Sequence, residues 1–467
     1  MNRVTKPACA SNGRARRWAT AVEPLENRTL LAATTNDPYF ASQYALANSA
    51  VAGAWQTTRG SAAMVVADTD TGADYTHQDL YENVWINQAE IPSYYKARLR
   101  DTDRDGRISF YDLNAAGNRS LMTDVNGNGY IDGGDLLQPV SAGGWDDGVN
   151  GRSNANDTYT DDIIGWDFAE SDNNPYDDGT ANSGHGTHTA GIMGAVGNNG
   201  VGISGVSQKL SMMIVRIFAD SGTSVSDSTL AAAIRYTADS GARAVNASWG
   251  GPGGRNGDAI YNAIRYAGNK GELFVTAAGN DGRNLDSRFF NDFPAEYSLD
   301  NILVVGATTA SGTLASFSNY GVTKVDLTAP GSGILSTLPG GNRYGQLSGT
   351  SMATPMVTGA AALTLAADPS LSVSELKTRL MSGADRSVAL GSSSLTGAQL
   401  DVNNAVLGRS GSQLSTASVA TSATETATAA TASTEATSVL SVRFDAVFSS
   451  VRVTAAERAS IAREILA

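Results

Sequence analysis

The chain has 467 residues, 41% of them hydrophobic, which predicts one large domain with a sizeable core. The formal net charge of −13 argues against nucleic acid as a partner and favours cations. The sequence contains no run of 18 apolar residues, so no transmembrane segment is predicted. The single cysteine, Cys9, cannot form an internal disulfide. If the fold needs an added cross-link, it must be something other than a disulfide.

Residues 1–35 are predicted to be a leader or a disordered N-terminal segment. They are basic but lack the apolar stretch of a standard signal peptide. Their sequence "VEPLENRTLLA" resembles an N-terminal segment that recurs in large secreted or surface proteins of some environmental bacteria. The main domain is expected to follow, over residues 36–408.

The tripeptide Asp70-Thr71-Gly72 follows a short apolar run and is found in two unrelated protease designs. In one, two aspartates share a proton, but the other Asp-Ser-Gly sequences lie in a Ser-rich loop (220–222) and at a helix end (239–241). In the other, one aspartate orients a histidine. Asp68 alternates onto the same strand face as Asp70, where it either raises the pKa of its neighbour or faces solvent at the strand end.

Residues 98–140 are predicted to be an insertion with two twelve-residue calcium loops, 101–112 and 124–135, the alternative being acidic surface turns. Alternate oxygens would wrap the cation, although aspartate at position twelve is shorter than the usual glutamate. The connecting segment is a poor helix, which favours separate, dockerin-like loops. The predicted ligands are Asp101, Asp103, Asp105, the Arg107 carbonyl, Ser109, Asp112, Asp124, Asn126, Asn128, Tyr130, Asp132 and Asp135.

The sequence "NSGHGTHTAGIMGA" (182–195) places His185 at the entry to a helix whose small residues permit close packing. His188 lies about one turn later. A metal-binding pair is the alternative, but two histidines without further His or Cys ligands make a poor zinc site.

Between residues 211 and 308, apolar strand-like runs alternate with helical patterns that end in Gly241 and Gly271. This order is typical of βαβ units around a buried parallel sheet. The fold class predicted is therefore α/β. The runs are 211–218, 228–241, 242–250, 258–271, 272–280 and 301–308.

The sequence "LSGTSMATPMVTGAAALTL" (347–365) places Ser351 at the start of a long Ala-rich helix. Backbone N–H groups at a helix N-terminus favour a developing negative charge. Pro355 is expected in the first turn, where its missing N–H costs little. Taken alone, Ser351 could equally be a helix cap.

The remainder of the chain differs in composition. Residues 409–439 are rich in Ser, Thr and Ala and are predicted to be a flexible linker. Residues 440–467 are predicted to be a C-terminal tail with one short helix, because Thr454 and Glu457 have capping-box spacing.

Taken together, "DTG", "GHGTH" and "GTSMATP" in this order resemble the subtilase family of serine peptidases over residues 36–408. The resemblance implies a three-layer α/β/α domain with a mostly parallel central sheet. It also implies a serine endopeptidase in which Asp70 orients His185, His185 acts as general base and Ser351 attacks the peptide bond. The segment 276–282 matches the family's oxyanion segment, which assigns Asn280 to that role.

The resemblance also implies a substrate groove, with Asp292 near the base of the pocket for the residue before the scissile bond (P1). An acidic residue at the bottom of this pocket would favour Arg or Lys at P1. The alternative is that Asp292 is an exposed aspartate in a loop. The other groove residues are Ser248, Trp249 and Gly250 on one edge, Gly222, Thr223 and Ser224 on the other, and Ala277, Ala278 and Gly279 as the pocket wall.

Finally, Asp79 and Asn199 match the family's stabilising calcium site, so Ca²⁺ is the expected cofactor and polypeptides are the expected substrates. The protein is expected to be monomeric and secreted or displayed on the cell surface, with a cytoplasmic processing protease as a variant. The rival from another class is a non-catalytic surface protein that uses the scaffold for binding.

Overall fold

The computed structural model describes residues 35–148, 159–181, 184–289 and 291–414. The predicted tail, the predicted leader except residue 35 and the predicted linker after residue 414 lie outside these ranges. Among the described residues, no helix is both long and apolar enough to cross a membrane.

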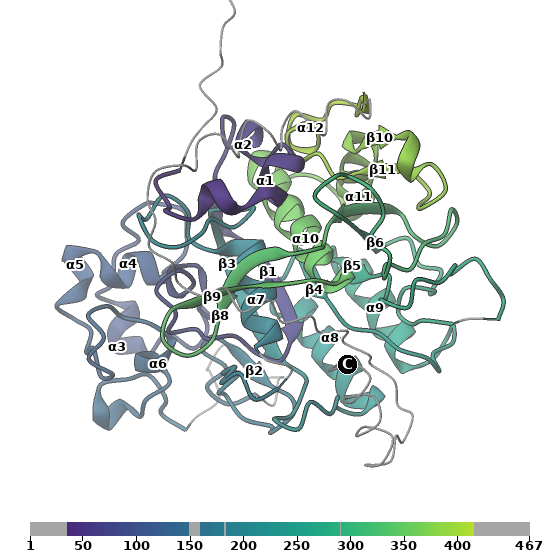
Figure 1. The fold of residues 1–467 in the computed structure, drawn as a ribbon. Helices are drawn as coiled ribbons and strands as arrows, with labels where there is room; N and C mark the ends of the chain where they lie inside the picture. The colour runs from purple at the N-terminus through teal and green to yellow at the C-terminus, as the bar shows by residue number, and fades with distance from the viewer. Residues whose placement is uncertain (1–34, 149–158, 182–183, 290, 415–467) are drawn as a thin grey trace, which may run out of the picture. The chain divides into compact units, whose positions relative to one another are not determined.

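A central sheet organises the domain (Figure 1). Within the described ranges it has ten strands in the order β12-β10-β11-β7-β6-β5-β4-β1-β3-β2, and only the β10–β11 pair is antiparallel. The strands are β1 (Gly60–Asp70), β2 (Gly165–Asp167), β3 (Lys209–Arg216), β4 (Ala244–Ala247), β5 (Leu273–Ala277), β6 (Ile302–Thr308), β7 (Leu327–Pro330), β10 (Asp385–Ser387), β11 (Ala398–Gln399) and β12 (Gln413–Leu414).

Two apolar cores lie on opposite faces of this sheet, and β1 contributes to both because its side chains alternate. Val66 packs with α7 (His185–Gly194) and α10 (Thr350–Ala367), together with α11 (Val373–Gly383) and α12 (Val402–Leu407). Val65 and Ala67 pack with α8 (Asp227–Asp239) and α9 (Ala259–Lys270). The predicted three-layer α/β/α arrangement is therefore confirmed.

Capping residues mark the starts of α8 and α9 and the end of α9. Ser226 accepts from the Thr229 N–H at the start of α8, and Asp258 accepts from the Tyr261 N–H at the start of α9. Gly271 closes α9 with a φ of 96°, a conformation that favours glycine.

Residues 81–142 form short helices, of which α3 to α6 lie at the left of Figure 1. They are η2 (Tyr81–Asn83), α3 (Ser93–Lys96), α4 (Phe110–Asn114), α5 (Ala116–Arg119), α6 (Gly133–Leu136) and η3 (Val140–Ala142). The remaining elements are η1 (Phe40–Ser42), α1 (Tyr44–Asn48), α2 (Val51–Ala54), η4 (Val388–Leu390) and the hairpin of β8 (Ile334–Leu338) and β9 (Arg343–Leu347). The predicted domain boundaries stay predictions.

Candidate active site

Asp70 and His185 meet at the carboxyl end of β1, where sites form in open parallel sheets. The Asp70 carboxylate lies 2.8 and 2.9 Å from Nδ1 of His185, and both side chains are buried. Gly186 makes this approach possible, because a side chain there would overlap the Gly72 carbonyl oxygen. The first turn of α7 is further fixed by the Gly186 N–H, which donates to Thr71 Oγ1 at 2.8 Å.

The charge of His185 is controlled by its surroundings. Burial disfavours the imidazolium, but the charge of Asp70 and its hydrogen bond outweigh burial and raise the pKa of His185. The other ring nitrogen, Nε2, is buried and has no hydrogen-bond partner among the described residues. His185 therefore has one nitrogen committed to a carboxylate and the other available for a proton.

Ser351 is the second residue of α10, and its hydroxyl donates to the Ser248 carbonyl oxygen at 3.2 Å. The Ser248 hydroxyl donates in return to the Ser351 carbonyl oxygen at 2.9 Å. That carbonyl would ordinarily accept from the backbone N–H four residues later, but Pro355 has none. Pro355 is thus the sixth residue of the helix rather than part of its first turn, and Ser248 satisfies the acceptor that it frees.

Thr350, the residue before Ser351, orients the side chain of Asn280. Asn280 Oδ1 accepts from the Thr350 N–H at 2.8 Å and from the Thr350 hydroxyl at 3.0 Å, which leaves the amide NH₂ pointing away from these groups. A Cβ atom added at Gly349 would lie 3.5 Å from the Ser351 nitrogen and 3.6 Å from Asn280 Nδ2. The Ser351 nitrogen and the Asn280 amide therefore both lie near Gly349, beside the serine.

Asp68 does not face solvent, because only 2% of its surface is exposed. Its Oδ1 accepts from Asn246 Nδ2 at 2.8 Å, and its Oδ2 lies 2.9 Å from the hydroxyl of Thr189. Burial, followed by the charge of Asp70, raises the pKa of Asp68 to about 8. The predicted proximity of the two aspartates is thus found, with Asp68 as the group whose pKa is raised.

These contacts join into one chain of hydrogen bonds beneath the site. Asn246 Nδ2 reaches both Asp68 and, at 3.1 Å, the Ser248 hydroxyl, which holds the carbonyl of Ser351. Thr189, at the other end, belongs to the helix that begins with His185. Polar groups inside the core therefore connect α7 to α10.

The predicted groove residues lie on three neighbouring segments. The side chains of Ser248 and Trp249 are buried, and the Trp249 indole N–H donates to Thr69 Oγ1 at 3.0 Å, so only their backbones could face a peptide. Gly222 lies in a tight turn after β3, and Thr223 and Ser224 are exposed beside it. Ala277 is the last residue of β5, and Ala278 and Gly279 lead from it into Asn280.

Asp292 is buried, with 7% of its surface exposed, which contradicts the exposed-loop alternative. The segment that holds it is attached to the groove edge, because Phe293 and Gly251 exchange two backbone hydrogen bonds of 2.8 and 2.9 Å. A Cβ atom added at Gly250 would lie 2.9 Å from Asp292 Oδ1, and one added at Gly279 would overlap Oδ2.

The two other histidines are bound to backbone. His188 is buried and its Nε2 lies 3.0 Å from the Ile334 carbonyl oxygen and 3.2 Å from that of Gly345. Burial, with a smaller contribution from His185, lowers the pKa of His188 to about 3. His77 lies 3.2 Å from the Arg343 carbonyl oxygen. The contacts of His185 and His188 thus go to different groups, which disfavours a shared zinc ion.

The first predicted calcium loop brings its first three carboxylates together. One oxygen each from Asp101, Asp103 and Asp105 lies within 4.8 Å of the others. Among the described residues, this is the one cluster of three potential metal-binding side chains that are this close together. Lys209 contacts Asp103 and lies 3.8 Å from Asp105. Asp112 has a different environment, because its oxygens accept from Ser109 and Thr102 and cap α4. Arg107 lies between Asp105 and Asp112 in the sequence, and its side chain donates to the Ile86 carbonyl oxygen.

The second loop is closed by its own hydrogen bonds. Asp124 accepts from the N–H groups of residues 127, 128 and 129, and Asp135 accepts from those of 125, 126 and 132. The amides of Asn126 and Asn128 donate to Asp132, and Tyr130 donates to the Thr76 carbonyl oxygen. The ligand roles of these residues stay predictions.

At the other expected calcium site, Asn199 Nδ2 donates to Asp79 Oδ1 at 2.8 Å. Burial raises the pKa of Asp79 to about 7, and the charge of the nearby Asp37 adds to this effect. Asp37 is itself buried and accepts from the N–H groups of Asn198 and Asn199. Sequence reasoning missed Asp37, which carries no motif of its own.

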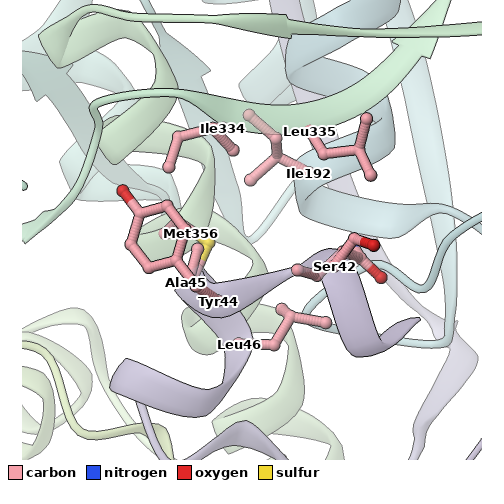
Figure 2. Close-up of a pocket in the computed structure, with 9 residues that line it drawn as sticks. Ser42, Tyr44, Ala45, Leu46, Ile192, Ile334, Leu335 and Met356 are labelled. Carbon is pink, nitrogen blue, oxygen red and sulfur yellow. The ribbon is translucent and has the colours of Figure 1, made fainter. Parts of the chain in front are cut away.

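Figure 2 shows a small pocket between α1 and the β8–β9 side of the domain. Its volume is about 10 Å³, comparable to the space of one water molecule, and its lining is largely apolar. It includes none of Asp70, His185 and Ser351. It is therefore too small and wrongly lined to be the substrate site.

Sequence reasoning also missed the polar residues that hold the site together. Thr350 positions Asn280, and Thr189 and Asn246 bind Asp68. Thr350 directly precedes Ser351 in the "GTSMATP" motif, so the sequence could have indicated that Thr350 takes part in the site. The partners of Asp68 come from other elements and became identifiable only once the fold brought them together.

Comparisons with known proteins identify the family of the chain. The sequence profile described as "Subtilase family" matches residues 61–412. Thermitase from Thermoactinomyces vulgaris is 41% identical over 224 residues, which cover 48% of this chain and 74% of thermitase. A thermophilic serine proteinase from Bacillus sp. (strain AK1) is 35% identical over 331 residues, 71% of this chain, and the chain spans only 59% of that relative.

A solved protease structure from Pseudoalteromonas arctica PAMC 21717 has a TM-score of 0.54 and 26% identity, covering 80% of this chain and 99% of that one. The profile match extends over well more than half of the chain and includes Asp70, His185, Asn280 and Ser351. The chain therefore belongs to the subtilase family of serine endopeptidases.

Proposed function

We propose that Asp70, His185 and Ser351 are the catalytic triad and that Asn280 is the oxyanion-hole side chain. The observation that carries this assignment is the buried contact of both Asp70 oxygens with His185 Nδ1, which leaves Nε2 for the serine. The family motifs at all three positions support it further.

In the first half of the reaction, Ser351 Oγ attacks the carbonyl carbon of the scissile peptide. Its proton passes to Nε2 of His185, and Asp70 stabilises the imidazolium that forms. For this step Oγ turns from the Ser248 carbonyl oxygen to Nε2, a tightening expected when substrate binds. His185 then gives the proton to the departing amine, and the acyl group remains on Ser351.

In the second half, water replaces the amine. His185 takes a proton from the water as its oxygen attacks the acyl carbon, and it returns the proton to Ser351 Oγ as the ester bond breaks. In both halves the negative oxygen of the tetrahedral intermediate would accept from the Ser351 N–H and Asn280 Nδ2, which both lie near Gly349. The N-terminus of α10 adds a favourable dipole.

The substrate backbone would lie between residues 248–250 and 222–224 as an added strand. The burial of the Ser248 and Trp249 side chains supports recognition through backbone groups, which suits an enzyme that acts on many polypeptides.

We further propose that calcium stabilises the protein. The three carboxylates of the first loop fit a hard cation, because Asp103 Oδ1 and Asp105 Oδ2 are buried oxygens without hydrogen-bond partners within the described part of the chain. Asp37, Asp79 and Asn199 would hold a second ion, whose charge would offset the burial of two neighbouring carboxylates. Bound calcium would supply folding stability and no step of the chemistry.

A location outside the cell suits such loops, because calcium is abundant there and modules with weak ligand sets bind it only at high concentration. We likewise propose that the protein is secreted and monomeric.

A fluorophosphonate probe tests the triad, because it reacts only with an activated serine. We expect labelling of the wild-type protein, none of Ser351→Ala, and strongly slowed labelling of His185→Ala. A matched control is Ser332→Ala, which alters another serine near the start of β8 and should label normally. Labelling that persists in Ser351→Ala would refute Ser351 as the nucleophile.

A further inference from the structure

Arg216 connects the central sheet to the turn that carries one edge of the proposed substrate groove. It is the last residue of β3, and it is paired in register with Asp70 of β1 and Asp167 of β2. Its side chain is buried, and its two terminal nitrogens contact different carboxylates. Nη1 contacts Asp167 Oδ2, and Nη2 contacts Asp220 Oδ1. Arg216 therefore joins the sheet edge that holds Asp70 to the segment that follows β3.

The two carboxylates lie in different surroundings. The Asp167 side chain is 1% exposed, and its Oδ1 accepts from the N–H groups of Ala169 and Glu170 at 2.7 and 3.0 Å. The Asp220 side chain is 69% exposed. Burial lowers the pKa of Arg216, but its hydrogen bond to Asp167 and the charges of both aspartates outweigh burial and raise the pKa. Arg216 thus stays charged, Asp167 offsets its burial, and Asp220 extends the contact to the surface.

The segment 217–225 is a short hairpin with an exposed tip. Backbone hydrogen bonds of 2.8, 3.0 and 3.1 Å close it. At the tip, residues 220, 221, 223 and 224 are exposed. Within the described part of the chain, the other side-chain hydrogen bonds of residues 219–224 join neighbours in the turn or reach the Val225 carbonyl oxygen. The Asp220 side chain thus supplies a link from this tip to the sheet.

The contact of Arg216 with Asp220 matters for geometry more than for folding stability. An ion pair with an exposed partner adds little stability, because water and salt screen it. Residues 222–224, however, are the proposed groove edge, and their backbone groups can pair with a substrate strand only if they keep the spacing of a β-ladder. A tip that is held before the substrate arrives need not be ordered on binding, which lowers the cost of association.

We propose that Arg216 is a positioning residue that, through Asp220, holds residues 222–224 ready to pair with the substrate backbone. Substrates that extend over several residues before the scissile bond then gain more from this edge than short ones, and part of that gain depends on Arg216. This inference rests on the proposed triad and groove and explains how the same site favours polypeptides. The alternative is an ion pair that supports the fold alone and leaves the response to substrate length unchanged.

Substrates of different length separate these alternatives. A tetrapeptide ester is compared with an acetylated single-residue ester that has the same P1 residue, and the ratio of their kcat/KM values is the length ratio. Asp220→Asn removes the exposed contact and leaves the buried pair of Arg216 with Asp167. We expect it to lower the length ratio by about 2- to 12-fold, the range for ordering one loop side chain at an interface. Hydrolysis of the single-residue ester and labelling by a small fluorophosphonate should stay unchanged.

Further variants test the two ends of the ion pair. Asp220→Glu keeps the charge and should recover most of the length ratio. Arg216→Lys has one ammonium nitrogen in place of two separate terminal nitrogens, so it should keep the buried pair with Asp167 and lower the ratio as Asp220→Asn does. Asp227→Asn makes the same change at another exposed carboxylate, the first residue of α8, and should leave the ratio unchanged.

Salt provides a readout that is independent of mutation. At about 1 M NaCl the screening length falls to about 3 Å, which weakens the exposed contact much more than the buried one. The wild-type length ratio should therefore fall towards that of Asp220→Asn, whereas the ratio of the variant should change much less. Equal responses of the two proteins to salt would refute the role of the ion pair.

The remaining outcomes distinguish this inference from the proposed triad. An unchanged length ratio in Asp220→Asn, or a loss of equal size for both esters, would refute the positioning role of Arg216 and leave the triad intact. A wild-type protein that fluorophosphonate does not label would refute the triad instead.

Discussion

Replacing Asp68 by asparagine should make the protein more stable at alkaline pH, although it removes a buried group two residues from the proposed catalytic aspartate. The Thr189 hydroxyl has one hydrogen and lies 2.9 Å from both Asp68 Oδ2 and the Gly186 carbonyl oxygen. A protonated Asp68 resolves this arrangement, since it donates to Thr189, which then donates to Gly186. The amide of asparagine can reproduce the donor to Thr189 and the acceptor for Asn246.

The magnitude follows from the pKa of about 8 in the folded protein and about 3.9 in an unfolded chain. The stabilisation from holding the proton is complete below the unfolded pKa and is lost as pH rises through the folded one. Between pH 6 and pH 9 the wild type should therefore lose about 2–3 kcal/mol relative to Asp68→Asn. The titratable groups that face Asp68 are Asp70 and His185, and both remain in the variant.

For a domain the size of residues 61–412 this corresponds to about 3 °C in melting temperature. Thermal melts at pH 6 and pH 9, both in a Ser351→Ala background that prevents self-digestion, would measure it. Asp300→Asn, an exposed carboxylate, is the matched control and should melt in parallel with its parent. Parallel curves for Asp68→Asn, or a loss of stability at both pH values, would contradict a protonated Asp68.

Three further changes have defined outcomes. Asn280→Ala should lower kcat by about 10²–10³-fold with a smaller effect on KM, the magnitude known from subtilisin itself, and unchanged kcat would exclude Asn280 from the oxyanion hole. Saturating calcium at about 100 times its Kd should add about 2.7 kcal/mol of stability, measured by thermal melts with calcium or EGTA, and an Asp103→Asn, Asp105→Asn double variant should lose much of this gain. Ser248→Ala should cost about 1–3 kcal/mol in denaturant unfolding, because it leaves the Ser351 carbonyl without its side-chain donor, and an unchanged midpoint would show that this bond contributes nothing.

Much of the fold could be predicted from the sequence because its signals are local. Apolar strands and capped helices alternate between residues 211 and 308, and the structure forms β3, α8, β4, α9, β5 and β6 there. The pairing of Asp70 with His185 was expected from motif order, and the structure places them in contact.

What could not be predicted depends on contacts between distant segments. The burial of Asp292 arises because its segment pairs with Gly251, about forty positions earlier in the chain, and nothing in "NDFP" indicates that partner. Likewise, the position of Pro355 was expected to be inconsequential, yet its missing N–H couples Ser351 to Ser248. Asp112 looks like a ligand by spacing alone, and the same spacing also makes it the N3 residue of a capping box.

The convergence of the proposed triad is tested most directly by a crystal structure of the wild-type protein after reaction with a fluorophosphonate. We predict phosphorus on Ser351 Oγ, a phosphonyl oxygen about 2.7–3.1 Å from both the Ser351 nitrogen and Asn280 Nδ2, and His185 Nε2 within hydrogen-bonding distance of the adduct. An adduct on another residue, or one whose oxygen meets neither donor, would contradict the account.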